Sequence, residues 1–201
     1  SGALSTMMSK IARRGPDASG QWADGSIGFG HQRLSIIDLS NYASQPMKDE
    51  VLDLVLVFNG TIYNYQSLRQ DLIKQGYTFF SHSDTEVIIK AYHFWGEDCV
   101  THLDGMFAFC IWNQKTNQLF VARDRMGIKP LYFSLTDQAF SFASNTQALV
   151  SIGVDSSINS VALQQQLSLH GVVPAPNTIL NGVNKIKPAT TLTIDTKGKV
   201  V

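Results

Sequence analysis

Short apolar runs recur along the chain and predict that much of it forms strands. The runs are rich in β-branched and aromatic residues and are separated by Asn, Asp and Gly, as strands joined by turns usually are. They fall at residues 26–34, 52–58, 107–112, 118–122, 131–134, 139–143 and 190–194. Residues 52–58 and 107–112 are almost continuously apolar, so we expect them in the core of a sheet rather than on its solvent-facing side.

Helical periodicity and end signals predict a few helices between these strands. They are expected over residues 4–13, 65–75, 83–96 and 145–152. The second ends before Gly76, a residue type that often follows a helix, and the third opens with Ser83-Asp-Thr-Glu86, which has the spacing of a capping box. Sheets with segregated helices predict an α+β fold or a layered sandwich.

The most informative local feature is Asn59-Gly60, which follows directly on the apolar run that starts at Val51. A strand that ends there would place a side-chain amide beside a backbone N–H that no Cβ shields. Two such donors side by side are suited to stabilising a developing oxyanion. The alternative is a hairpin turn, because Asn-Gly is also the strongest two-residue hairpin signal.

Arg33 and Asp84 lie at comparable strand and helix ends. Their presence favours a binding site over a hairpin turn at Asn59-Gly60. Arg33 is either half of a surface salt bridge or a planar fork that holds a carboxylate in two parallel bonds. Asp84 is either a helix cap or an anchor for a substrate ammonium. If Arg33 binds a carboxylate and Asp84 binds an ammonium, the two together predict a binding site for a free amino acid. The end of its side chain would then contact Asn59 and Gly60.

Composition narrows the classes of partner. The 201 residues are 44% hydrophobic, which suffices for a core in one large domain or two small ones. Sixteen basic and sixteen acidic residues leave no net charge, so nucleic acid and anionic membranes are poor candidates. The apolar runs are too short to span a membrane and no signal peptide is visible, so we expect a soluble cytoplasmic protein. The histidines and cysteines show no metal-ligand spacing.

Six motifs in a fixed order give the chain a specific resemblance to one family. They are Arg14–Asp17, Arg33–Asp38, Asn59–Asn64, Ser83–Glu86, Gly105–Phe109 and Ala122–Tyr132. Together they resemble class II glutamine amidotransferase domains, which are N-terminal nucleophile hydrolases, and the arrangement is most similar to that of asparagine synthetases. The resemblance implies a four-layer α+β sandwich, with two antiparallel sheets between helical layers. Residues 91–100 and 171–176 resemble, more narrowly, the enzyme that amidates N-acetylglutaminylglutamine.

The resemblance assigns a role to each matching residue. Arg33 matches the arginine that holds the glutamine carboxylate, and Asp84 matches the carboxylate that receives the α-ammonium. Asn59 and Gly60 match the oxyanion hole, by side-chain amide and main-chain N–H. The adjoining backbone contacts match Leu34, Ser35, Ile36 and Ile37. Thr61 departs from the pattern, because asparagine synthetases commonly have glutamate there. If this position contributes a backbone group, threonine is tolerated; if the carboxylate matters, glutamine affinity or the contact with the α-amino group is weakened.

The nucleophile of this family is an N-terminal cysteine, whose own α-amine can act as the base. This chain starts with Ser1-Gly2, and too few residues precede Gly15 to form the family's buried strand, turn and helix. Cys99 follows a helix break and Cys110 alternates within a strand, so both are expected to be packing residues. We therefore expect residues 1–201 to form an amidotransferase domain without its first strand and nucleophile.

Two segments are expected to have structural or connecting roles. Arg123 and Asp124 match a motif in which we expect them to pair their charges at a strand end. Pro174 and Pro176 prevent regular structure and favour an extended chain. Residues 170–201 are therefore expected to lead towards a synthetase domain outside this sequence.

The resemblance implies a glutaminase that supplies ammonia to a carbon–nitrogen ligase. L-Glutamine would be the substrate, and the partner would be a C-terminal synthetase domain that uses ATP and Mg²⁺. Neither cofactor is expected to bind these residues, which have no Gly-rich phosphate loop or carboxylate cluster. A homodimer is compatible with this interpretation, and the isolated chain is expected to be inactive. Two alternatives stay open: a non-catalytic module that binds glutamine or docks a partner, and another class II amidotransferase, such as a sugar-phosphate or phosphoribosyl enzyme.

Overall fold

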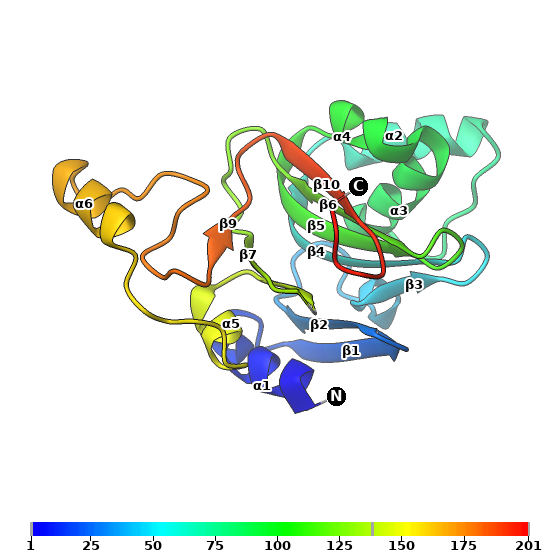
Figure 1. Ribbon diagram of the computed structural model, residues 1–201. Helices are drawn as coiled ribbons and strands as arrows, with labels where there is room; N and C mark the ends of the chain where they lie inside the picture. Colours follow the sequence, from blue (N-terminus) through cyan, green and yellow to red (C-terminus); the bar gives the residue numbers. More distant parts are fainter. Residues whose placement is uncertain (1, 138, 201) are drawn as a thin grey trace.

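A five-stranded antiparallel sheet lies at the centre of the computed structural model, which describes residues 2–137 and 139–200 (Figure 1). The strand order is β10-β6-β5-β4-β3. The strands are β3 (Met47–Asp49), β4 (Leu54–Ile62), β5 (Gly105–Asn113), β6 (Gln118–Arg123) and β10 (Thr190–Ile194). β4 and β5 are the longest of these and are paired along their full nine-residue length. The two most apolar runs therefore lie inside the sheet, as predicted.

Three helices cover one face of this sheet, above it in Figure 1. They are α2 (Tyr65–Lys74), α3 (Asp84–Trp95) and the short α4 (Cys99–His102). Leu72 of α2 and Ile88 of α3 are fully buried and share one hydrophobic cluster with Phe109 and Phe120 of the sheet. Each such side chain contributes about 1.5–3 kcal/mol by leaving water, so this layer is held mainly by apolar burial.

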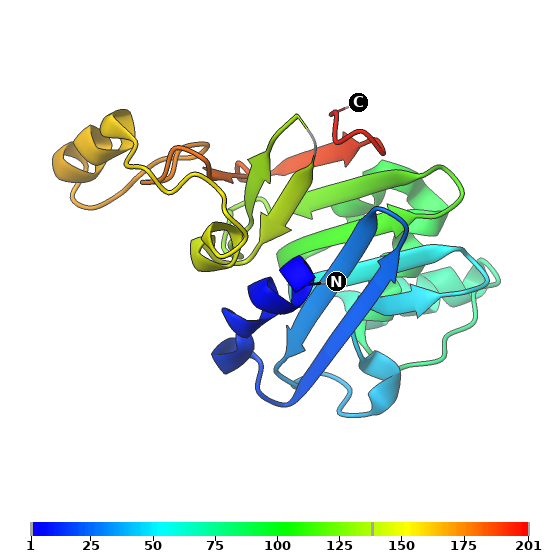
Figure 2. The ribbon, with the colours of Figure 1, turned by 60° about the horizontal axis from the view of Figure 1, so that its bottom comes forward.

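Two smaller sheets cover the opposite face. The first pairs β1 (Ala18–Asp24) with β2 (Ile27–Arg33), and the second has the order β8 (Phe140–Ala143), β7 (Tyr132–Leu135) and β9 (Asn184–Lys185). Figure 2 shows the β1–β2 hairpin lying across the large sheet. Phe29 of β2 joins Val57 and Cys110 of the large sheet in a second buried cluster, which binds these two layers together.

Helices outside the smaller sheets complete the layers. α1 (Gly2–Ser9) packs on β2, and α5 (Thr146–Val150) packs on β8. The layers therefore run helices, large sheet, smaller sheets and helices, which confirms the predicted four-layer sandwich. Helix α6 (Ser160–Ser168) projects from this body, and an irregular stretch that contains Pro174 and Pro176 follows it (Figure 1). None of the described helices is long and apolar enough to cross a membrane.

Most predicted elements are confirmed, with boundaries that differ by a few residues. The helix expected over 4–13 is instead α1 followed by the separate 3₁₀ turn η1 (Ala12–Arg14). Two further 3₁₀ turns are η2 (Asn41–Ala43) and η3 (Gly96–Asp98). The sequence pattern does not predict β1, β3, β9, α4 or α6. The residues of β1 are mostly exposed, and Ser19, Gln21 and Asp24 interrupt its apolar positions, so it lacks the apolar signal of a strand.

The expectation that a strand ends at Asn59-Gly60 is wrong. β4 continues to Ile62, with Asn59 opposite Ala108 and Gly60 opposite Phe107. The hairpin alternative is wrong for the same reason. β5 offers a backbone partner to every residue of β4, and this long-range pairing overrides the local turn preference of Asn-Gly.

Gly60 is required by the close approach of β5. A Cβ added there would lie 2.1 Å from the carbonyl oxygen of Met106 and 2.8 Å from the Cα of Phe107. Both obstacles are backbone atoms, which cannot move aside without disturbing the strand pair. A glycine at this position is therefore explained by packing before any ligand is considered.

Gly60→Ala is expected to lower the free energy of unfolding by about 3 kcal/mol, near the upper end of the usual cost of overpacking. Denaturant or thermal unfolding of the purified protein measures this. Gly28→Ala in β2 is the matched control, because its Cβ would meet only ordinary contacts, the nearest at 3.6 Å. Equal losses of stability in the two variants would contradict this explanation of Gly60.

Candidate functional site

Arg33 is the last residue of β2 and is buried, with 7% of its surface exposed. Its Nη1 donates to the carbonyl of Ser40 at 3.0 Å, and its Nη2 donates to the carbonyl of Asp38. These bonds close the loop that follows the strand and use two of the five guanidinium N–H groups. No carboxylate pairs with Arg33 among the described residues, so the interpretation as a surface salt bridge is wrong.

Asp84 is the first residue of α3 and is also buried. Its Oδ2 accepts the backbone N–H of Ile62 at 3.0 Å, which ties the helix to the end of β4. Burial raises the pKa of Asp84, and the hydrogen bond from Ile62 opposes this shift. The helix cap is Ser83, whose Oγ accepts the N–H of Glu86, so Asp84 is not needed as a cap. No basic side chain pairs with Asp84 among the described residues.

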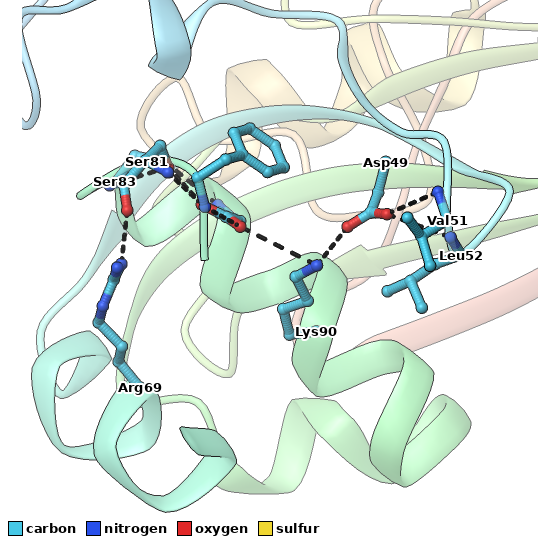
Figure 3. Close-up of polar contacts among 9 residues, drawn as sticks. Asp49, Val51, Leu52, Arg69, Ser81, Ser83 and Lys90 are labelled. Atoms are coloured by element: carbon cyan, nitrogen blue, oxygen red, sulfur yellow. Dashed lines mark hydrogen bonds and ion pairs between the residues drawn. The ribbon is translucent and has the colours of Figure 1, made fainter. Parts of the chain in front are cut away.

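A buried charge network fixes the segment that leads into α3 (Figure 3). The carboxylate of Glu86 accepts the N–H groups of Phe80 and Ser81, at 3.0 and 2.7 Å. Lys90, one turn further along, lies 4.0 Å from Glu86 and bonds to Asp49 of β3. Only half of the predicted capping box therefore forms, because the Glu86 carboxylate bonds to the preceding loop. The network ties the first turn of α3 to the sheet.

Asn59 lines a cavity of about 470 Å³ between the two smaller sheets. Residues of β2 form one side, residues of β8 form the other, and the face of β4 and β5 forms the floor. Arg33, Gly60 and Asp84 do not belong to the cavity lining within the described parts of the chain. The four predicted residues thus do not all face this cavity.

A few hydrogen bonds nevertheless connect the segments that carry the four predicted residues. The carbonyl of Asp38 contacts Arg33, and the carboxylate of Asp38 accepts the N–H of His82, two residues before Asp84. Ile62, which bonds to Asp84, belongs to the same strand as the other two predicted residues. The fold brings all four into one region near the end of β4, and their convergence on a single ligand stays a prediction.

The remaining predicted contacts come from a loop and a strand. Leu34, Ser35, Ile36 and Ile37 form the irregular loop after β2, where Leu34 is 57% and Ile36 is 72% exposed. Thr61 is half-buried within β4. The expected roles of these residues are contacts to a ligand, and they stay predictions.

His31 is a feature of the site that the motifs do not single out. It lies two residues before Arg33 in β2 and lines the cavity. Burial lowers the pKa of His31 to about 4, although a hydrogen bond to the backbone of Phe58 acts in the opposite direction, so the ring is neutral near pH 7. Its Nδ1 is buried without a hydrogen-bond partner among the described residues. The two-residue spacing, which places His31 and Arg33 on one face of a strand, is the signal that could have found it.

Both cysteines of the chain are buried and protonated. Burial raises the pKa of the Cys99 thiol to about 12 and raises that of Cys110 well above its ordinary value. Both side chains belong to the hydrophobic clusters of the core, which confirms the prediction that they are packing residues. Ser1 lies outside the described residues. Within those residues, no group of three or more His, Cys, Asp or Glu side chains could hold a metal ion.

Comparison with known proteins decides the family. The family described as "Glutamine amidotransferase domain" matches residues 1–201. The chain belongs to this family.

Relatives of this amidotransferase domain are considerably longer proteins. The chain is 42% identical over 197 residues to asparagine synthetase [glutamine-hydrolyzing] 1 of Bacillus subtilis (strain 168), covering 98% of this chain and 31% of that protein. It is 34% identical to putative asparagine synthetase [glutamine-hydrolyzing] 2 of Methanocaldococcus jannaschii, covering 96% of this chain and 41% of that protein. The domain thus spans about a third of the length of the Bacillus relative.

The fold of the domain is also that of a solved amidotransferase. Glutamine phosphoribosylpyrophosphate amidotransferase from B. subtilis superposes with a TM-score of 0.73 at 20% identity, over 100% of this chain and 46% of that one. At this identity the likeness concerns the fold alone. It agrees with the layered architecture predicted from the motifs.

Arg123 and Asp124 organise the loop after β6 of the amidotransferase domain. The Asp124 carboxylate accepts four backbone N–H groups, those of Phe107, Met126, Ile128 and Lys129. The Arg123 guanidinium donates to three carbonyls, those of Gly127, Lys129 and Ile186. The expectation that Arg123 and Asp124 pair with each other is wrong: no ion pair joins them in the described chain, and each binds backbone groups instead.

Asp124→Asn is expected to lower the free energy of unfolding by about 3 kcal/mol at neutral pH, because an amide cannot accept all four N–H groups. Burial acts to raise the pKa of Asp124, but these hydrogen bonds together lower it below its ordinary value of 3.8. The stabilisation is therefore complete at neutral pH and is lost as the pH falls below 3.8. Denaturant unfolding across this pH range measures the effect.

The control for this experiment is Asp71→Asn, which removes an exposed ion pair with Lys74 and is expected to leave stability nearly unchanged. A difference between Asp124→Asn and the parent protein that stays constant down to acid pH would contradict the role of the carboxylate charge.

Proposed function

We propose that this domain hydrolyses L-glutamine and releases ammonia for a synthetase domain of the same protein. The observation that carries the proposal is a pair of opposite buried charges, Arg33 and Asp84, neither of which has an ion-pair partner among the described residues. Uncompensated buried charges are costly, so a ligand that neutralises both is expected to bind. An α-amino acid brings a carboxylate for Arg33 and an ammonium for Asp84.

Family membership and the names of the relatives support glutamine as this amino acid. The family is that of glutamine amidotransferase domains, and the Bacillus subtilis relative is named a glutamine-hydrolysing asparagine synthetase. In the proposed complex, the loop of Leu34, Ser35, Ile36 and Ile37 and the backbone of Thr61 would contact the bound substrate. The amide end of the side chain would point towards Asn59 and Gly60.

The proposed reaction is attack of a thiolate on the amide carbon of glutamine. Ammonia leaves from the tetrahedral intermediate, and water then hydrolyses the thioester, which gives glutamate and restores the thiol. The side-chain amide of Asn59 and the N–H of Gly60 would stabilise the negative oxygen of the intermediate. Cys99 and Cys110 are buried in the two hydrophobic clusters, so we assign the thiol to another cysteine.

We place that thiol on an extended segment outside the described residues, seated in the cavity between β2 and β8. No strand pairing joins the two smaller sheets among the residues that the structure describes, and each sheet contributes an edge strand to the cavity wall. A strand in this position would join them into one continuous sheet. It would also bring a donor within reach of the unpartnered Nδ1 of His31.

We assign the use of the ammonia to a part of the protein outside this domain, and the 31% share of the Bacillus relative that the domain covers supports this proposal. We propose a following domain, reached through residues 170–201, that activates a carboxylate with ATP and Mg²⁺. The acceptor is aspartate or an acetylated dipeptide such as N-acetylglutaminylglutamine. Cytoplasmic location and a homodimer stay predictions.

Arg33→Ala in the full-length protein is expected to lower kcat/KM for glutamine by an amount equivalent to about 2–4 kcal/mol, the cost of truncating one side of a buried charge pair. Steady-state glutaminase assays measure this. Arg125→Ala is the matched control, because that guanidinium also donates to a backbone carbonyl, of Leu103 at 2.7 Å, without a proposed ligand role. Unchanged kcat/KM in Arg33→Ala would refute the carboxylate-binding role.

Asn59→Ala is expected to lower glutaminase turnover about 10²–10³-fold, as loss of one oxyanion-hole donor does. Synthesis driven by added ammonia should be spared, because that route does not break the amide bond. Both rates and the melting temperature are measured on one preparation.

Asn64→Ala serves as the structural comparison, since the Asn64 amide only bonds to the backbone of His102 and Asp104. It should not separate the two activities. Parallel loss of both activities in Asn59→Ala, with a lower melting temperature, would count against the oxyanion role. A full-length protein that binds glutamine but does not hydrolyse it would favour the non-catalytic module.

A further inference from the structure

Asp38 connects the two sides of the proposed amino-acid site, the carboxylate-binding side at Arg33 and the ammonium-binding side at Asp84. Its backbone carbonyl accepts Nη2 of Arg33, on the side that would hold the carboxylate. Its Oδ2 accepts the backbone N–H of His82 at 2.7 Å, on the side that carries Asp84. Asp38 and His82 are 44 residues apart in the sequence, so this hydrogen bond is a long-range bridge and not a local turn.

The geometry of Asp38 is adapted to this bridge. Its φ of 53° lies in the left-handed region that L-residues other than Asn and Asp rarely adopt. Its Oδ1 accepts both the N–H and the hydroxyl of Ser40, at 3.0 and 2.6 Å, which fixes the direction of the carboxylate. The other oxygen is thereby left to face His82.

The segment that receives the bridge is held firmly on its other sides. Glu86 accepts the N–H groups of Phe80 and Ser81, and Arg69 of α2 donates to the carbonyl of Ser81 at 2.7 Å (Figure 3). Only the contact with Asp38 relates this segment to the loop that Arg33 closes, among the hydrogen bonds of the described residues. Asp38 thus links the loop that Arg33 closes to the segment that leads into Asp84.

We propose that Asp38 is a positioning residue that determines specificity for α-amino acids, by fixing the spacing between Arg33 and Asp84. This inference rests on the proposed hydrolysis of glutamine. A ligand that carries both charges depends on that spacing, whereas a ligand that carries only the carboxylate does not. Loss of the bridge should therefore weaken the recognition of the α-ammonium selectively.

The test compares L-glutamine with glutaramate, which has the same carboxylate and amide but no α-ammonium. KM for glutamine and the inhibition constant of glutaramate are measured on the full-length protein. Neither constant depends on the concentration of active enzyme, so partial unfolding of a variant does not imitate the effect.

Asp38→Gly removes the bridge, and glycine accepts the φ of 53° without strain. It should raise KM for glutamine about tenfold or more, because displacing one binding group by about 1 Å can cost as much. The inhibition constant of glutaramate should stay within about threefold of the parent value, because Arg33 keeps its bond to the carbonyl of residue 38. Asp38→Asn, which also tolerates this backbone, should show the same pattern to a smaller extent.

Asp53→Gly is the matched control. Asp53 has a similar φ of 56° but lies in the turn before β4, so the variant loosens the backbone without touching the bridge. Both constants should then be unchanged. Arg33→Ala gives the contrasting pattern, since it should raise both constants together.

Selective loss of glutamine affinity in both Asp38 variants would support the inference. Unchanged constants in both variants, or an equal rise for the two ligands, would overturn it while leaving the proposed hydrolysis intact. Failure of the parent protein to hydrolyse glutamine would instead overturn the proposed function, and this inference with it.

Discussion

The pairing of β4 with β5 is the interaction on which the rest of the structure depends. These two strands lie inside the large sheet and are covered on one face by α2 and α3 and on the other by the smaller sheets. Both hydrophobic clusters take side chains from them, such as Phe58 on one face and Val57 on the other. Because successive residues of a strand point to opposite faces, a shift of one residue would exchange the two cores.

The same strand pairing fixes the positions of the proposed oxyanion-hole donors. Asn59 and Gly60 lie within a strand that is hydrogen-bonded and covered on both faces, rather than on a free loop. Donors that are fixed before the substrate arrives need no reorganisation during the reaction, which is the main advantage of an oxyanion hole. The close approach of β5 at Gly60 and the proposed ligand role of its N–H therefore make compatible demands on one residue.

Sequence patterns predict the parts of this protein that local chemistry determines. The apolar runs of β4 and β5, Ser83 as a helix cap and Gly76 after α2 all follow from short-range rules. Local rules predict a strand end at Asn59-Gly60, but pairing with Ala108 and Phe107 of β5, which are distant in the sequence, overrides this turn preference. No local rule gives the position of β5.

What sequence patterns miss in the site also depends on contacts between distant segments. The motifs identify Arg33 and Asp84, but the bridge through Asp38 and the unpartnered Nδ1 of His31 depend on how distant segments meet. Arg123 and Asp124 show a related failure. Adjacent opposite charges suggest an ion pair, yet Arg123 donates to backbone carbonyls and Asp124 accepts backbone N–H groups. Buried backbone groups left without hydrogen bonds would be costly, and these side chains provide the bonds.

The two buried cysteines can report local opening of the fold. Cys110 lies in the large sheet and Cys99 begins α4 in the helical layer, and neither thiol is reactive while its surroundings stay closed. Their rates of alkylation therefore report opening events at two separate interfaces, one on each face of the large sheet. Labelling of Cys99 that outpaces labelling of Cys110 would mean that the helical layer opens more often than the interface with the smaller sheets.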